Sequence, residues 1–283
     1  MKKMIIQSYK DVDNINLNMH MIRPDDCSDE PLPAIVFFFC GAWTGFDASK
    51  FYPHSVYLAS RGMVCFHAEL RVEPIHGTTP MDCVIDGKSA VRWLRSHAKS
   101  LGIDPNRLAV GGGSAAGHVS ACCGIIDGLD DPQDMNPDIS SIPNAMVLYN
   151  PVLDLLKHDR WINLFGGLEV ARSLSPTQHL KQGVPPALVM HGNADEIVEV
   201  EQAIHFNELM SKLGNHCELR LYDKQAHGFF NYFDGENPLF TETLRETDIF
   251  LTSLGFLNGP EQIDTFVYDP EDIEKQWLER QQK

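Results

Sequence analysis

The sequence lacks the features that mark several whole classes of protein. No apolar run among its 283 residues approaches the length of roughly 18 residues that a membrane span requires. Basic residues are also few: 23 Lys and Arg stand against 39 Asp and Glu, and the net charge of −16 repels nucleic-acid phosphates. We therefore expect no membrane association and no nucleic-acid partner.

Paired metal and redox motifs are missing as well. The seven cysteines are odd in number and scattered, with no C-x-x-C pair, and the twelve histidines form no H-E-x-x-H motif. The N-terminus has two lysines but only three consecutive apolar residues, unlike a secretory signal. These absences predict free thiols in a reducing, cytoplasmic setting, with no metal ion and no cofactor.

What is present is an alternation of strand-like and helix-like segments. Apolar residues spaced by three and four predict helices from Val84 to Leu101 and from Ala203 to Leu213, and a last helix covers 240–256. This alternation predicts an α/β fold, with a mostly parallel central sheet and helices on both faces. Continuous or alternating apolar runs place the strands at 15–22, 34–39, 63–70, 107–113, 145–150, 187–192 and 217–223.

Residues 1–256 are expected to form this α/β domain, with two interruptions. The segment 128–143 holds four Asp and three Pro, and is interpreted as a solvated surface loop rather than a cation site. The segment 152–184 is either a small cap over a site or a longer crossover. The tail, 257–283, has a helix start where proline follows Asp269; that helix packs either on the body or on a second copy in a homodimer.

The stretch GGGSAAGH, residues 111–118, has one functional side chain among small residues. Such a stretch is a poor helix or strand former, but it suits a tight turn from the preceding strand into a helix. Ser114 would then stand at the carboxyl edge of the sheet, with Gly112 and Ala116 small enough to avoid collision. The pattern favours a nucleophile elbow over a phosphate-binding turn, because the P-loop lysine and the G-x-G-x-x-G spacing are absent.

A nucleophilic serine needs a base, and the base needs a partner that orients it. Asp195 follows the expected strand ALVMHG and His227 follows the next strand, so both reach the edge that carries Ser114. Taken singly, Asp195 could cap the following helix and His227 could be an ordinary loop histidine. The order Ser, Asp, His after three strands instead predicts a catalytic triad with His227 as the base.

A tetrahedral oxyanion needs at least two N–H donors beside the serine. The Ala115 N–H points toward the same space as the Ser114 hydroxyl, aided by the positive end of the following helix. A second donor is expected from the loop after the strand 34–39, where Gly41 and Ala42 let the backbone approach a substrate.

With these residues in place, the chain resembles the α/β-hydrolase superfamily over about residues 10–256. More narrowly, it is similar to the acetyl-esterase and hormone-sensitive-lipase-like carboxylesterases, near bacterial esterases of acylated carbohydrates. The likeness depends on FFFCGAW, GIDPNRLAVGGGSAAGH, HGNADEIV and AHGFF. It implies an α/β-hydrolase fold with a small or absent cap, the triad Ser114, Asp195 and His227, and oxyanion donors at Gly41, Ala42 and Ala115.

The chain departs from that family's pattern in two places. The H-G-G-G oxyanion motif appears as Phe-Cys-Gly-Ala, beginning at Phe39, and the G-x-S-x-G pentapeptide ends in Ala116. The oxyanion donors are backbone groups and survive both changes. Cys40 is interpreted as a small buried hydrophobe, and His118, four residues after the nucleophile, is not expected to act as a base.

Several aromatic side chains flank the predicted site. Trp43, Phe46 and Phe229 are candidates to line a substrate pocket, although each could equally be an ordinary core aromatic. Arg71 and Asp86 are expected to form a supporting ion pair with no part in the chemistry.

The resulting function hypothesis is a serine carboxylesterase. It would hydrolyse short-chain, acetyl-like esters through an acyl-enzyme, with an acylated sugar as one candidate substrate. One alternative is a serine peptidase of the oligopeptidase type, although Ser114 comes too early to leave room for the large propeller domain of those enzymes. The other is a non-catalytic ligand-binding protein on a hydrolase scaffold, which the altered oxyanion motif favours and the complete triad opposes.

Overall fold

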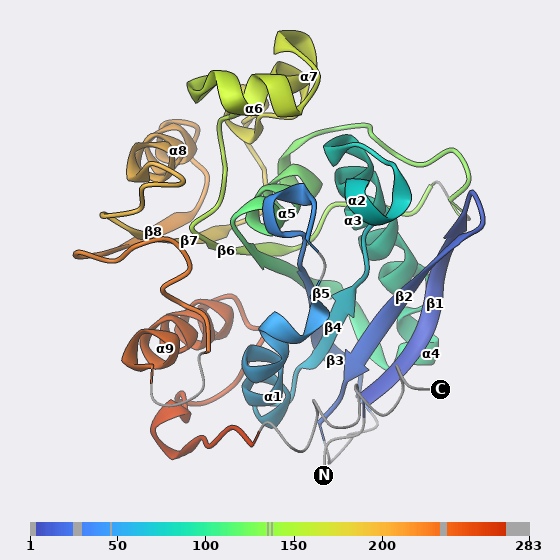
Figure 1. The fold of residues 1–283 in the computed structure, drawn as a ribbon. Helices are drawn as coiled ribbons and strands as arrows, with labels where there is room; N and C mark the ends of the chain where they lie inside the picture. Colours follow the sequence, from blue (N-terminus) through green and yellow to red (C-terminus); the bar gives the residue numbers. More distant parts are fainter. Residues whose placement is uncertain are drawn as a thin grey trace.

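The computed structural model describes residues 4–24, 30–45, 47–134, 136, 138–232 and 237–269. Within them, eight strands form one sheet in the order β1-β2-β4-β3-β5-β6-β7-β8 (Figure 1). β1 and β2 form an antiparallel hairpin and β2 pairs antiparallel with β4, whereas the strands from β4 to β8 are parallel. The strands are β1 (Met4–Val12), β2 (Ile15–Ile22), β3 (Leu32–Phe38), β4 (Val64–Ala68), β5 (Ile103–Gly113), β6 (Ala145–Tyr149), β7 (Ala187–Gly192) and β8 (Cys217–Tyr222).

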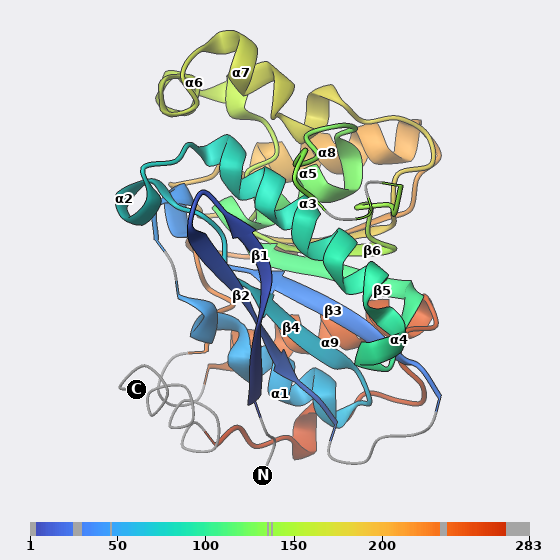
Figure 2. The ribbon, with the colours of Figure 1, turned by 90° about the vertical axis from the view of Figure 1, so that its right-hand side faces the viewer.

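Helices cover both faces of the sheet, as the sequence predicted. Figures 1 and 2 show α3, α5 and α8 on one face and α1 and α9 on the other. Each layer buries its own apolar cluster against strands that are apolar on both sides. The helices are α1 (Tyr52–Ser60), α2 (Glu73–His76), α3 (Pro80–Ser96), α4 (Ala98–Leu101), α5 (Ala115–Ile125), α6 (Asp159–Leu164), α7 (Leu168–Ser173), α8 (Val200–Lys212) and α9 (Pro238–Ser253), with short 3-10 turns at Gly41–Trp43, Ala48–Phe51, Leu155–Lys157, Pro176–Gln178 and Ile263–Thr265.

The sequence did not predict β1. A bulge between Ser8 and Lys10 shifts its register against β2, which places Tyr9 and Lys10 side by side as buried residues and breaks the strict alternation of a strand. The buried Lys10 has partners: its ammonium lies 2.8 Å from Asp86 on α3 and 2.7 Å from Asp131. The first strand is therefore fixed to the body by charge as well as by its ladder.

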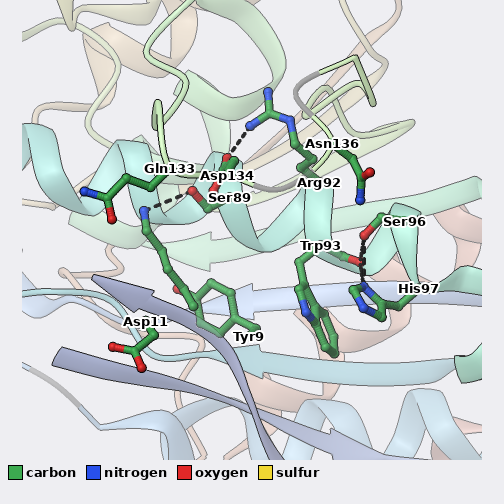
Figure 3. A pocket seen from close by; sticks show the side chains of 11 residues that line it. Tyr9, Asp11, Ser89, Arg92, Trp93, Ser96, His97, Gln133, Asp134 and Asn136 are labelled. Atoms are coloured by element: carbon green, nitrogen blue, oxygen red, sulfur yellow. Dashed lines mark hydrogen bonds and ion pairs between the residues drawn. The ribbon is translucent and has the colours of Figure 1, made fainter. Parts of the chain in front are cut away.

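The loop 128–143 contains no helix or strand in its described residues, but it is not simply solvated. Asp131 is buried against Lys10, while Asp130 and Asp134 both pair with Arg92 on α3. Figure 3 shows Arg92 and Asp134 beside each other on the wall of a pocket. The loop is anchored to the body because its carboxylates meet the cations of α3 and β1.

The segment 152–184 carries α6 and α7 and stands above the body of the molecule (Figures 1 and 2). It rests on the loop that follows β3: Trp161 and Phe165 pack edge-to-face on Trp43, with ring centroids 5.4 and 4.9 Å away. The segment is therefore a small cap rather than a plain crossover.

The described part of the tail packs on the body beside α1 and α9. Ile263 is buried in the same cluster as α9, Phe266 packs against Tyr57 of α1, and Tyr268 against Tyr232. The helix predicted after Asp269 lies outside the described residues, so its position stays a prediction. Among the described residues, no helix is long and apolar enough to span a membrane.

Candidate active site

The turn between β5 and α5 has the geometry expected of a nucleophile elbow. Ser114 adopts φ 57° and ψ −122°, a strained conformation for a residue with a side chain. Its N–H is bonded to the Tyr149 carbonyl at the end of β6 (2.9 Å), which holds the turn in place. Gly112 is required here, because a Cβ at that position would lie 2.7 Å from the Ala116 backbone.

The three predicted side chains meet at the carboxyl edge of the sheet. The Nε2 of His227 lies 2.9 Å from the Oγ of Ser114, and its Nδ1 lies 2.7 Å from Oδ2 of Asp195. They arrive from three different connections, after β5, β7 and β8. This continuous chain from hydroxyl to imidazole to carboxylate is the arrangement that moves a proton from a serine to its base.

Asp195 is held as a buried anion. Burial acts to raise the pKa of its carboxyl, but hydrogen bonds from His191, from His227 and from the Val198 N–H lower that pKa well below its ordinary value. The other oxygen, Oδ1, accepts the N–H groups of Ile197 and Val198, both at 2.9 Å. The backbone thus fixes one carboxylate oxygen, and the second faces His227.

The predicted oxyanion donors lie on two segments. Ala115 is the first residue of α5, where an N–H has no partner inside its own helix. The loop after β3 forms the 3-10 turn Gly41–Trp43, in which Ala42 and Trp43 both have positive φ (51° and 58°). The Trp43 N–H is bonded to the Cys40 carbonyl, so Gly41 and Ala42 are the candidates that remain on this loop.

His118 connects this loop to the cap. The indole N–H of Trp43 donates to its Nδ1 (3.2 Å), and its Nε2 donates to the Leu174 carbonyl (2.7 Å). Burial lowers the pKa of His118 to about 4, so the imidazole is neutral at physiological pH. Sequence reasoning gave His118 no role, because its partners lie far away along the chain.

Two further residues at this edge were missed by the sequence analysis. Asn150, directly after β6, has its Nδ2 3.5 Å from Nε2 of His227 and accepts the Gly228 N–H on Oδ1 (3.2 Å). His191, on β7, donates Nε2–H to the Val198 carbonyl (2.8 Å) and lies 3.4 Å from Oδ2 of Asp195. A polar residue at the end of a buried strand was the available signal for both.

The three aromatic candidates for the substrate pocket differ in their surroundings. Trp43 is buried but forms part of the wall of a pocket of about 510 Å³ between the cap and the start of α3. Phe229 packs against Tyr222 and Phe230, which is the setting of a core residue, and its contact with substrate stays a prediction. Phe46 lies outside the described residues.

A second cavity, of about 280 Å³, lies between β1, α3 and the loop 128–143 (Figure 3). Its lysine and arginine already have partners: Lys10 bonds Asp86 and Ser89, and Arg92 bonds Asp134. Among the described residues, no group of three or more His, Cys, Asp or Glu side chains is placed to hold a metal ion.

The fold and the serine–histidine–aspartate chain at the sheet edge together define an α/β-hydrolase. A sequence profile of the BD-FAE family matches residues 19–210, and one of the dienelactone hydrolase family matches residues 157–278. The chain belongs to the BD-FAE family.

The proteins to which the chain is similar include several esterases. The apo form of Thermogutta terrifontis esterase 2 is 41% identical with a TM-score of 0.86, covering 90% of this chain and 96% of that one. Esterase LipC of Mycobacterium tuberculosis is 33% identical over 66% of this chain and 50% of that one, and the acetylxylan esterase of Xylanibacter ruminicola is 28% identical over 65% and 39%. The chain spans about half the length of the curated relatives it matches first.

Proposed function

We propose that this protein is a serine carboxylesterase with Ser114 as nucleophile, His227 as base and Asp195 as its orienting partner. The observation that carries the proposal is the position of His227, within 2.9 Å of the Ser114 hydroxyl and 2.7 Å of the Asp195 carboxylate. The esterase relatives support the same chemistry.

In this mechanism His227 Nε2 takes the Ser114 proton as Oγ attacks the ester carbonyl carbon. The carbonyl oxygen becomes an oxyanion, which the N–H groups of Gly41, Ala42 and Ala115 stabilise; removal of one such donor typically costs about 2.7–4 kcal/mol. Asp195 stabilises the imidazolium. His227 then gives its proton to the alcohol oxygen as the carbon–oxygen bond breaks. Water, activated by the same imidazole, releases the carboxylic acid from the acyl-enzyme.

We extend the proposal to short acyl groups. Thermogutta terrifontis esterase 2 has been solved with propionate and with butyrate bound, and these are short carboxylates. The acetylxylan esterase among the relatives supports an acetylated carbohydrate as the natural substrate. The cap contributes Leu164, Phe165 and Val170 to the pocket beside Trp43, and we propose that this apolar surface receives part of the substrate next to the oxyanion loop.

Fluorophosphonate labelling tests the nucleophile. We expect mass spectrometry to place one adduct on Ser114, and Ser114→Ala to abolish both the adduct and p-nitrophenyl acetate hydrolysis. Ser120→Ala is the matched control, because that buried serine of the same helix bonds only the Ala116 carbonyl in the described chain. A wild-type protein without an adduct would favour a non-catalytic binding protein, and hydrolysis that survives in Ser114→Ala would reject the assignment.

A substrate panel tests the specificity. We expect p-nitrophenyl acetate and butyrate to be cleaved faster than the octanoate, and acetylated xylo-oligosaccharides to be deacetylated. Faster cleavage of the octanoate contradicts the short-chain proposal. Cleavage of peptide p-nitroanilides at a comparable rate would favour the peptidase alternative.

We also propose a cytoplasmic location. Cys40, Cys83 and Cys122 are buried as thiols, which fits a reducing compartment. Fractionation of the source cells tests this location, and recovery of the protein outside the cytoplasm contradicts it.

A further inference from the structure

The carboxyl end of β6 places a side chain beside the predicted triad. The proposed esterase mechanism gives this side chain no role. Asn150 is 1% exposed and follows β6, which lies between the nucleophile strand β5 and β7. Its φ is 33°, in the left-handed region, and its N–H is bonded to the Met190 carbonyl at 2.7 Å. The backbone therefore holds an uncommon conformation that keeps this amide at the site.

The orientation of the Asn150 amide is determined by its partners. Oδ1 accepts the Gly228 N–H at 3.2 Å, so the NH2 group is the end that faces Nε2 of His227, 3.5 Å away. Nδ1 of His227 donates to Asp195, which leaves the single lone pair of the neutral ring on Nε2. Two donors, the Ser114 hydroxyl and the Asn150 amide, are thus directed at one acceptor.

We propose that Asn150 is a positioning residue that disfavours the imidazolium form of His227. The inference rests on the proposed esterase function, in which Nε2 carries the proton between the two half-steps. Once Nε2 is protonated, its N–H faces the N–H of Asn150, and two donors without an acceptor between them repel each other. The proton is therefore passed on readily, from Nε2 to the oxygen of the departing alcohol, and the ring returns to its acceptor form.

One group in contact with His227 opposes this effect by charge, because the Asp195 carboxylate at Nδ1 stabilises the imidazolium. Among the described residues, Asp195 is the charged group bonded to the ring, with His191 behind that carboxylate. The contacts from the ends of β5 and β6 are the uncharged Ser114 and Asn150. Replacing the amide by a carboxylate therefore changes the electrostatics at Nε2 more directly than any distant substitution.

Asn150→Asp is the sharpest test, because it keeps the size of the side chain and an oxygen for Gly228 while it turns the donor into an anion. The readout is the rate of fluorophosphonate labelling of Ser114 against pH, which depends on the unprotonated base and on no particular ester. We expect the midpoint of the acid limb to move up by about one to three pH units, the effect of an opposite charge at this range. Asn150→Leu removes the donor without adding charge, and we expect a smaller upward shift.

The matched control is Asn144→Asp, at the opposite end of the same strand, where Oδ1 accepts from Leu108 and Arg95. We expect its midpoint to equal that of the wild type. Unmoved midpoints in folded Asn150 variants, or an equal shift in Asn144→Asp, would overturn the inference even if the rates fall, because a purely structural role lowers rates without moving the limb. If Asn150→Asp does not fold, the Asn150→Leu midpoint decides. Absence of any wild-type adduct on Ser114 would instead reject the proposed function, and the inference with it.

Discussion

Two buried aspartates in this molecule are surrounded by hydrogen bonds, yet they serve different ends. Asp86, on α3, meets the ammonium of Lys10 at 2.8 Å and the guanidinium of Arg71 at 2.7 Å. Asp195 meets the imidazole of His227 and two backbone N–H groups. The partners of Asp86 are an ammonium and a guanidinium, whereas the imidazole of His227 beside Asp195 gains and loses a proton in the proposed mechanism.

The difference lies in what the partners of each aspartate contact on their other side. Arg71 and Lys10 are themselves buried and face further carboxylates, Asp82 and Asp131. Both cations are therefore paired inside the fold. His227 is only partly buried and offers its second nitrogen to Ser114. The cluster around Asp86, in which the cations are all paired, holds β1 and α3 together. The pair of Asp195 and His227 leaves one ring nitrogen for the proposed chemistry.

The largest effect is expected from Asp195→Asn. The amide stabilises the wrong tautomer of His227 and gives no charge to the imidazolium, so kcat/KM for p-nitrophenyl acetate should fall by about 10⁴-fold. The melting temperature should change much less than the activity. Activity within tenfold of the wild type would contradict the role of Asp195 in orienting His227.

Asp86→Asn should show the opposite pattern. Lys10 and Arg71 would lose the anion that they share and keep only Asp131 and Asp82. Breaking a buried pair costs up to about 3–5 kcal/mol of unfolding free energy. Urea denaturation measures this loss, while kcat/KM of the folded fraction should stay near the wild-type value. A stable but inactive variant would place Asp86 in the chemistry and refute the assignment.

Trp43→Phe should have a smaller effect. The variant keeps an aromatic ring in the cluster with Phe165 but removes the N–H that bonds His118 at 3.2 Å. A hydrogen bond of this kind contributes about 1 kcal/mol, equivalent to roughly a fivefold change. We expect kcat to fall by about that factor with KM little changed, because the bond positions the oxyanion loop. An unchanged kcat would show that the bond between Trp43 and His118 does not position the oxyanion loop.

The last expected effect is confined to acid. The pKa of Asp195 is lowered in the folded state, so its ionised form stabilises the protein above the unfolded-state pKa of about 3.9, and this contribution is lost as the pH falls below it. The stability difference between wild type and Asp195→Asn should therefore be constant between pH 6 and 8 and shrink below about pH 4. Urea midpoints at these pH values measure it, and a constant difference down to pH 3 would contradict the shift.

The central strands and the convergence of the triad could be read from the sequence because their signals are local. β3, β6 and β7 are short apolar runs, and parallel strands bring their carboxyl ends to one edge. β1 could not be read in this way, because the bulge at Ser8 removes the alternation by which a strand is recognised.

The supporting residues were out of reach for a different reason. Asn150 before a proline resembles an ordinary turn, and only the fold brings its amide to the ring of His227. The bond between Trp43 and His118 likewise joins two connections of the sheet. Pairings of this kind are set by tertiary packing, which leaves no pattern in the neighbouring residues.

The hydrogen bond from His118 to the Leu174 carbonyl has a consequence for how this scaffold can be altered. One end of the insert 152–184 is anchored to the helix that carries the nucleophile, so a graft of a foreign insert must supply a carbonyl at that place or leave Trp43 without a fixed acceptor. The tips of α6 and α7, where Leu164 and Leu168 face solvent, do not have to supply this carbonyl. Replacements that change the cap while sparing the reactive groups therefore belong at those tips.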